Sequence, residues 1–71
     1  MPEMKTNMRE LRQNMGMNQE DLAGIVGVRR ETIARLEKGL YNPSLKLAMD
    51  IAKVFKRTVE EMFEFEEEED E

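Results

Sequence analysis

The segment 19–38, QEDLAGIVGVRRETIARLEK, constrains the fold more than any other part of the chain. Its apolar residues have the spacing of two short helices, which Gly27 separates. Because glycine has no Cβ atom, Gly27 can adopt the positive φ that a tight turn between two helices requires. Small or apolar residues stand where the two helices must touch: Leu22, Ala23, Val26, Val28, Ile33 and Leu36. This pattern is typical of a helix-turn-helix, whose second helix enters the major groove of DNA.

The second helix of this segment, expected from about Arg29 to Lys38, presents a charged face to solvent. Five residues on that face are candidates for reading bases: Arg29, Arg30, Glu31, Thr32 and Arg35. An arginine can donate two hydrogen bonds to guanine, a glutamate can accept one from cytosine, and a threonine can meet a thymine methyl group. The alternative is an ordinary solvated face, but the flanking apolar pattern favours DNA binding.

The composition narrows the classes of protein that the chain can represent. Its 71 residues suffice for one domain but not for a large enclosed cleft, and they include neither cysteine nor histidine. The commonest general base and the commonest metal ligand are therefore missing. We expect no catalytic residues, no metal, no cofactor and no small-molecule ligand. No apolar run has the length of a membrane span, so the simplest expectation is a cytoplasmic protein without a membrane partner.

The net charge of −5 conceals an uneven distribution. Residues 64–71 hold seven of the 16 acidic groups and none of the 11 basic groups. Residues 1–63 therefore carry a net charge of +2, which suits DNA binding, and the rest carries −7. We divide the chain into a DNA-binding domain over residues 1–65 and an acidic, disordered tail over residues 66–71. The tail either serves solubility or competes with DNA for the basic face.

Capping residues predict where several helices begin. Asn18, followed by Asp21, is expected to cap the second helix, and Thr58 with Glu61 forms a capping box for a short fifth helix. Ser44 is expected to cap a fourth helix. The fourth helix has an apolar stripe: Leu45, Ala48, Ile51, Ala52 and Phe55. A first helix is predicted by residues at helical spacing: Met8, Leu11, Arg12 and Met15.

Residues around the segment 19–38 are candidates for phosphate contacts. Asn18 and Gln19 begin the second helix, whose backbone amides and dipole can hold a phosphate, and we favour such a contact by Gln19. The loop after the third helix should flank the groove, and it adds three candidates: Tyr41, Asn42 and Ser44. Lys38 and Lys46 would add positive charge nearby. Alternatively, Asn18 only caps its helix, Gln19 is solvated, and Tyr41 packs with its hydroxyl exposed.

Residues 8–63, MRELRQNMGMNQEDLAGIVGVRRETIARLEKGLYNPSLKLAMDIAKVFKRTVEEMF, resemble the lambda-Cro and phage-repressor class of helix-turn-helix regulators, also called the xenobiotic-response-element family. The sequence looks most like compact single-domain members such as the cytolysin repressor, which share YNPSL and a terminal Phe-x-aromatic segment. The resemblance implies an all-α, five-helix, lambda-repressor-like DNA-binding domain with a small two-stranded sheet formed by the chain ends. It also implies a homodimer on an inverted repeat in double-stranded DNA.

The resemblance assigns roles to single residues. The family's phosphate-binding glutamine falls on Gln19, its loop asparagine on Asn42, and its base-reading positions on the five candidates named above. A family salt bridge between the first and third helices falls on Arg12 and Glu37, a pair that the sequence alone merely permits. The chain ends would pair near Met4 and Phe65. The dimer contact would lie at or near three residues: Met62, Phe63 and Phe65.

Two positions depart from the family pattern. Arg29 stands where Ser or Thr often caps the recognition helix, and losing that cap costs about 1 kcal/mol. Lys56 and Arg57 stand where Gly-Val usually precedes the last helix. Without the glycine, we expect the fourth helix to end in a less tight turn.

The sequence therefore predicts a sequence-specific DNA-binding transcriptional regulator, a repressor that acts as a homodimer. One alternative on the same fold is an antitoxin or a restriction-system controller. Another is a protein-interaction module that uses the helices as a scaffold and the acidic tail as its working surface. An enzyme is the least favoured class, since no convergent set of titratable residues is evident.

Overall fold

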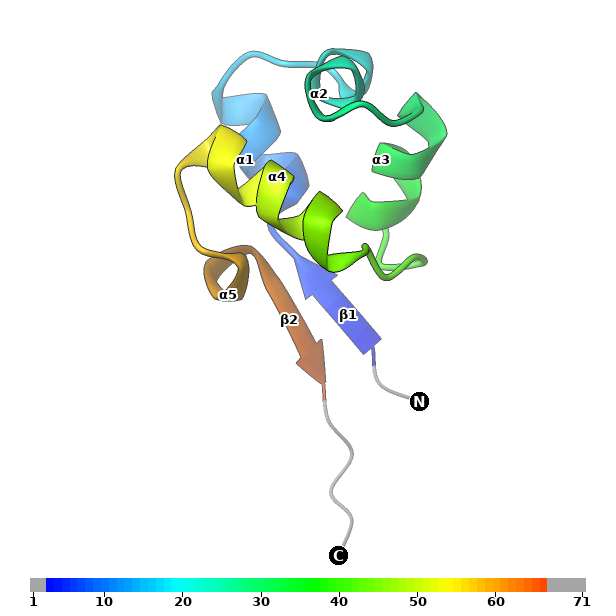
Figure 1. Ribbon diagram of the computed structural model, residues 1–71, viewed down its shortest axis with the longest axis vertical. Helices are drawn as coiled ribbons and strands as arrows, with labels where there is room; N and C mark the ends of the chain where they lie inside the picture. The colour runs from blue at the N-terminus through cyan, green and yellow to red at the C-terminus, as the bar shows by residue number, and fades with distance from the viewer. Residues whose placement is uncertain (1–2, 67–71) are drawn as a thin grey trace, which may run out of the picture.

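The computed structural model describes residues 3–66, and within that range it contains five helices and a two-stranded sheet (Figure 1). The elements follow in the order β1 (Glu3–Thr6), α1 (Met8–Asn14), α2 (Gln19–Val26), α3 (Arg30–Glu37), α4 (Leu45–Phe55), α5 (Val59–Met62) and β2 (Phe63–Glu66). The predicted five-helix fold with a small sheet is confirmed. Glu66, the first residue of the expected acidic tail, lies in β2, and residues 67–71 lie outside the described residues.

Side-chain caps fix the starts of α2, α4 and α5 where the sequence predicts them. Asn18 Oδ1 accepts from the Asp21 amide at 2.7 Å, and the Asp21 carboxylate accepts from the Asn18 amide at 3.0 Å. Thr58 and Glu61 form the same reciprocal box at the start of α5. Ser44 caps α4 by accepting from a backbone amide of its first turn at 3.1 Å. These bonds pair amides that a helix cannot satisfy internally.

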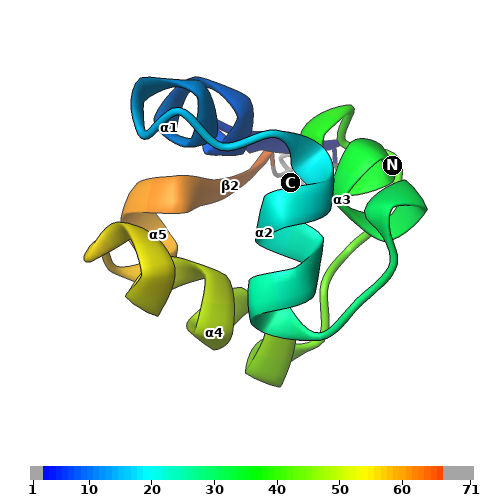
Figure 2. The same cartoon turned by 90° about the horizontal axis from the view of Figure 1, so that it is seen from above.

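One apolar core receives side chains from every helix and from both strands. Its buried members are Met4, Met8, Leu22, Ala23, Ile33, Leu36, Leu47, Ala48, Ile51, Ala52, Phe55, Met62 and Phe63. In Figure 1 the sheet lies at one end of the molecule and α2 at the other. Seen from above in Figure 2, α2 is nearest the viewer, and α1, α3, α4 and α5 are arranged around it. The core therefore holds α2 at the end of the molecule opposite the sheet, and α3 runs from beside α2 towards β1.

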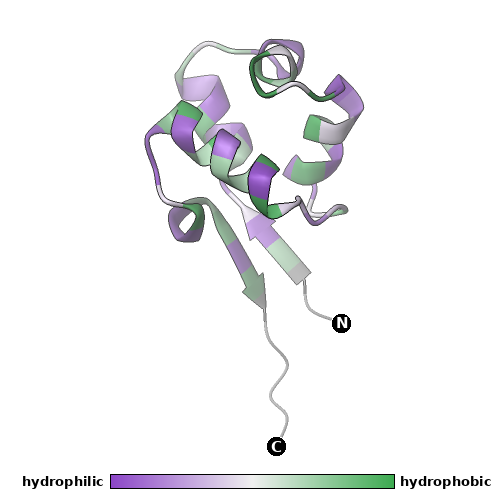
Figure 3. Ribbon diagram, viewed as in Figure 1, coloured by the Kyte–Doolittle hydropathy of each residue, from purple (hydrophilic) through white to green (hydrophobic). Residues whose placement is uncertain are grey.

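The α4 stripe differs from the prediction at one position. Leu45 is 73% exposed, so its predicted place in the core is wrong, and Leu47 is buried instead. At about 3.6 residues per turn, the face centred on Ile51 and Phe55 includes Leu47 but leaves Leu45 at its margin. Figure 3 shows the result as alternating hydrophobic and hydrophilic bands along α4.

The two strands pair antiparallel, with Met4 opposite Phe65 and Thr6 opposite Phe63, as the family resemblance implies. Opposite residues of an antiparallel pair lie on the same face. Met4 and Phe63 on that face are buried, whereas Phe65, beyond the core, is 46% exposed. The Met4 carbonyl lies so close to Gly39 that a Cβ atom there would be 2.6 Å from its oxygen. Glycine at position 39, where φ is +75°, therefore allows β1 to pack against the end of α3.

The end of α4 corrects another expectation. Lys56 has φ 56° and ψ 44°, the left-handed conformation that glycine usually supplies after a helix. The Arg57 amide donates to the Ala52 carbonyl at 3.0 Å, which closes the turn. The expected looser turn is therefore wrong: lysine adopts the tight turn, at a conformational cost of about 1–2 kcal/mol.

Replacing Lys56 with glycine should therefore stabilise the fold. The left-handed strain is removed, and the larger entropy of glycine in the unfolded chain offsets part of the gain, so we expect an increase of about 0.5–1 kcal/mol in the free energy of unfolding. Urea unfolding followed by circular dichroism measures the difference. Arg57→Gly is the matched control and should be destabilising, because Arg57 has no positive φ. If Lys56→Gly is no more stable than the wild type, the left-handed conformation of Lys56 does not cost the fold the expected free energy.

Candidate nucleic-acid interface

The packing of α2 against α3 decides which side of α3 faces solvent. After α2, Gly27 adopts φ 77° and ψ 33°, and its amide donates to the Ala23 carbonyl at 2.9 Å. The Val28 amide donates to the same oxygen at 3.0 Å, which completes the turn. Ile33 and Leu36, on one side of α3, are fully buried. The opposite side of α3 is therefore held outward.

That outward side carries the residues predicted to read bases, and we call it the reading face. Four of its residues are exposed: Arg29, Arg30, Glu31 and Arg35. The fifth, Thr32, is half-buried. Arg29 is the N-cap of this helix, as the family pattern implies, and it forms no side-chain cap; Lys38 is the C-cap. Figure 3 colours the first turn of α3 as hydrophilic, in keeping with a face that lies in water.

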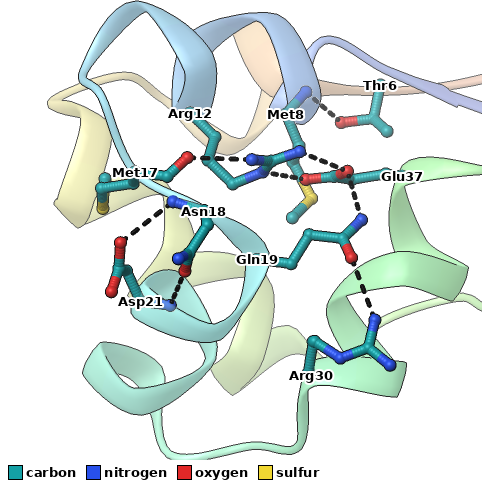
Figure 4. Close-up of polar contacts among 9 residues, drawn as sticks. All are labelled: Thr6, Met8, Arg12, Met17, Asn18, Gln19, Asp21, Arg30 and Glu37. Atoms are coloured by element: carbon teal, nitrogen blue, oxygen red, sulfur yellow. Dashed lines mark hydrogen bonds and ion pairs between the residues drawn. The ribbon is translucent and has the colours of Figure 1, made fainter.

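Behind the reading face, the predicted partners Arg12 and Glu37 meet in a buried ion pair (Figure 4). Arg12 Nε donates to Glu37 Oε2 at 2.7 Å, and Arg12 Nη2 donates to Glu37 Oε1 at 3.1 Å. The third guanidinium nitrogen donates to the Met17 carbonyl at 2.9 Å. The two side chains are only 8% and 4% exposed. The hydrogen bond to Glu37 raises the pKa of Arg12 above its usual value despite the opposing effect of burial, so the guanidinium stays charged.

Gln19 connects this ion pair to the reading face. Its Nε2 donates to Glu37 Oε1 at 3.1 Å, and its Oε1 accepts from Arg30 Nη1 at 3.4 Å. The sequence indicates only a phosphate contact for Gln19, and this contact stays a prediction. No pattern in the sequence signals the bonds that the side chain makes, because its partners lie 18 and 11 positions away.

The loop between α3 and α4 lies beside the reading face. Thr32 and two of the loop candidates, Tyr41 and Ser44, line one surface hollow of about 330 Å³. Lys46, which is expected to add positive charge beside the loop, also lines it. The Lys46 ammonium group lies 2.8 Å from the Asp50 carboxylate in an exposed pair. The structure thus brings Thr32, Tyr41 and Ser44 together, whereas Asn42 is exposed and does not line this hollow.

The residues predicted for the dimer contact do not share one environment. Met62 is 1% exposed and Phe63 is 7% exposed, because both belong to the core of the single chain. Phe65 is the exposed member of the set. A dimer contact at this place would therefore depend on Phe65, with Met62 and Phe63 supporting it from below.

The described residues offer little else for chemistry. Between residues 3 and 66, no group of three or more His, Cys, Asp or Glu side chains is arranged to hold a metal ion. None of the helices in that range combines the length and the apolar character needed to cross a membrane.

The buried and outward sides of α3, together with the turn before it, define a helix-turn-helix protein. The chain belongs to the Cro/C1-type helix-turn-helix family of DNA-binding transcriptional regulators, whose model matches residues 8–62. An uncharacterised helix-turn-helix-type transcriptional regulator of Archaeoglobus fulgidus is 59% identical over 66 residues, which cover 93% of this chain and 94% of that protein. The regulator YgzD of Bacillus subtilis is 49% identical over 65 residues, covering 92% of this chain and 98% of that protein.

Solved structures agree with this assignment. The restriction-modification controller protein C.AhdI from Aeromonas hydrophila is 33% identical with a TM-score of 0.70, covering 78% of this chain and 83% of that chain. The clp gene regulator ClgR from Corynebacterium glutamicum has the same fold, with a TM-score of 0.67 at 23% identity, over 73% of this chain and 55% of that chain.

Breaking the buried ion pair on one side should be strongly destabilising. Arg12→Met or Glu37→Met alone leaves a buried charge without its partner, and we expect a loss of about 3–5 kcal/mol in unfolding free energy, enough to unfold a domain of this size. The paired variant Arg12→Met/Glu37→Met should recover most of the loss, because no charge remains buried. Circular dichroism during urea unfolding measures all three variants.

The exposed pair supplies the control. Lys46→Met removes one partner of an ion pair whose lysine side chain is 85% exposed, so stability should change little. If the single Arg12→Met and Glu37→Met variants lose as little unfolding free energy as Lys46→Met, the buried pair does not stabilise the packing of α1 against α3.

Proposed function

We propose that this protein is a sequence-specific DNA-binding repressor of transcription that acts in the cytoplasm as a homodimer on an inverted repeat. One observation carries the proposal: α3 buries Ile33 and Leu36, while the arginines at its N-cap, in its first turn and in its last turn are exposed. Membership of a family of DNA-binding transcriptional regulators supports it. We propose no catalytic activity, since regulators of this kind are typically not enzymes.

In this proposal α3 enters the major groove with its first turn deepest. Arg30 would donate to guanine O6 and N7, the most discriminating contact that one side chain can make. Glu31 would accept from cytosine or orient a neighbouring arginine, and Thr32 would meet a thymine methyl group or a phosphate. Arg29 and Arg35 would flank this contact along the groove.

Phosphate contacts would fix the position of the domain on the duplex. On one side they would come from the start of α2, where Asn18 and Gln19 lie at the positive end of the helix dipole. On the other side they would come from the end of α3 and the loop after it, through Lys38, Tyr41, Asn42 and Ser44. Such contacts release counterions, so the affinity should fall steeply as the salt concentration rises.

A homodimer would double the length of DNA that is read. Two copies related by a twofold axis would reach half-sites about 34 Å apart, one turn of the duplex. Phe65 is the candidate contact, because it is a large apolar side chain with 46% of its surface exposed at the end of the sheet. Repression would follow from occupying a promoter.

The likeness to C.AhdI favours a second candidate, the control of a restriction-modification system. Both candidates require the same DNA-binding chemistry. They differ in where the bound site lies in the genome, since a controller would bind beside restriction or methyltransferase genes.

Selection of bound sites from random duplexes tests the proposal directly. We expect one preferred palindromic site, and we expect Arg30→Ala to weaken binding to it by about 1–3 kcal/mol and to relax the base preference at one position per half-site. Lys53→Ala is the charge-matched control, because Lys53 is exposed on α4 outside the proposed interface. Equal weakening on every sequence would make Arg30 a phosphate contact instead.

The dimer contact can be tested separately by sedimentation. Phe65→Ala should raise the dimer dissociation constant by at least about tenfold, as expected for a buried aromatic anchor of an interface. Leu45→Ala truncates an apolar side chain that is even more exposed, at 73%, and should leave the dimer unchanged. An unaltered dissociation constant for Phe65→Ala would rule out this face.

A further inference from the structure

The Gln19 amide lies between a buried carboxylate and an arginine of the reading face (Figure 4). An amide has a donor end and an acceptor end, whereas an ionised carboxylate can only accept. Glu37 Oε1 accepts from Gln19 Nε2, so the amide oxygen of Gln19 faces the Arg30 guanidinium. The carboxylate therefore fixes which end of the amide meets the arginine.

We propose that the buried Arg12–Glu37 pair determines base choice at a distance, by orienting Gln19 so that it holds Arg30 in position to read a guanine. This inference rests on the proposed function, because it concerns how the reading face selects a base. Arg12 and Glu37 are positioning residues in this arrangement, since they act through the Gln19 side chain.

The anchor is rigid because each of its groups has several partners. Arg12 donates twice to Glu37 and once to the Met17 carbonyl, and the Glu37 side chain is only 4% exposed. Glu37 lies in the last turn of α3 and Arg30 in the first. Gln19, the first residue of α2, therefore bridges the two ends of the recognition helix.

The orientation of the amide matters for the arginine. A reversed amide would place its NH₂ group against the guanidinium, two donors facing each other, and its oxygen against Glu37, two acceptors facing each other. In the observed orientation Arg30 donates one N–H to Gln19, and its other N–H groups remain available to donate to guanine O6 and N7. An exposed arginine without this bond would sample many more rotamers before binding.

The test measures discrimination rather than affinity. A preferred site is first selected with the wild-type protein, and the position whose preference Arg30→Ala relaxes is identified. The measured quantity is the ratio of dissociation constants for the other bases and for guanine at that position. Gln19→Met keeps the shape but cannot form these hydrogen bonds, and it should lower the ratio by about threefold to tenfold. The ratios at other positions should not change.

Three further variants separate positioning from other roles. Gln13→Met alters an exposed glutamine of α1 and should change no ratio. Arg12→Met/Glu37→Met removes the anchor without leaving a buried charge, and it should lower the ratio at the Arg30 position as Gln19→Met does. Gln19→Met in the Arg30→Ala background tests the step from Gln19 to Arg30 by itself: it should lower that ratio no further, because the arginine that Gln19 orients is gone.

The outcomes distinguish the inference from the proposed function. A lost phosphate contact by Gln19, or lower stability, would weaken binding to all sites alike and leave the ratio unchanged. An unchanged ratio in folded Gln19→Met would therefore overturn the positioning role, with the proposed function intact. A wild-type protein that selects no preferred site would refute the proposed function, and the inference with it.

Discussion

The carboxylate of Glu37 joins the three helices on which the interface depends. It accepts from Arg12 of α1 and from Gln19 of α2, while its own backbone completes the last turn of α3. Apolar burial is non-directional, so the core alone fixes the distances between the helices better than their rotation. Directional bonds to a buried charge add that restraint, and their cost in desolvation is offset because both carboxylate oxygens have donors.

The parts of the fold that sequence reasoning predicts well depend on neighbours in the chain. The boxes of Asn18 with Asp21 and of Thr58 with Glu61 form between residues three positions apart, so residue types and spacing suffice to place the starts of their helices. The turn at Gly27 is equally local. Once these points are fixed, the period of the helix decides that Ile33 and Leu36 turn inward, and the arginines of the reading face must then turn outward.

The parts that sequence reasoning does not predict depend on distant partners. An apolar residue near a chain end has the same pattern whether it packs in its own core or against a second copy, so Met62 and Phe63 could not be told from Phe65 before the sheet was known. Gln19 has the same difficulty, because its polar ends meet groups of another helix. Lys56 shows a different limit of sequence reasoning. Residue preferences predict glycine in a left-handed turn, because glycine adopts it at the lowest conformational cost. Here the packing of the surrounding helices imposes that turn on a lysine.

The pairing of β1 with β2 brings the start of the first strand and the end of the last strand side by side. Glu3 and Glu66 are opposite each other in an antiparallel pair, so a two-residue hairpin turn such as Asn-Gly is long enough to connect them. A permuted chain, joined there and opened between α1 and α2, would keep α2, α3 and the loop after it in one continuous segment, whereas α1 with Arg12 would move to the other end of the chain. The strand pairing, which is now the contact of largest sequence separation, would become a local one, and the sheet would form early in folding instead of waiting for the helices to assemble.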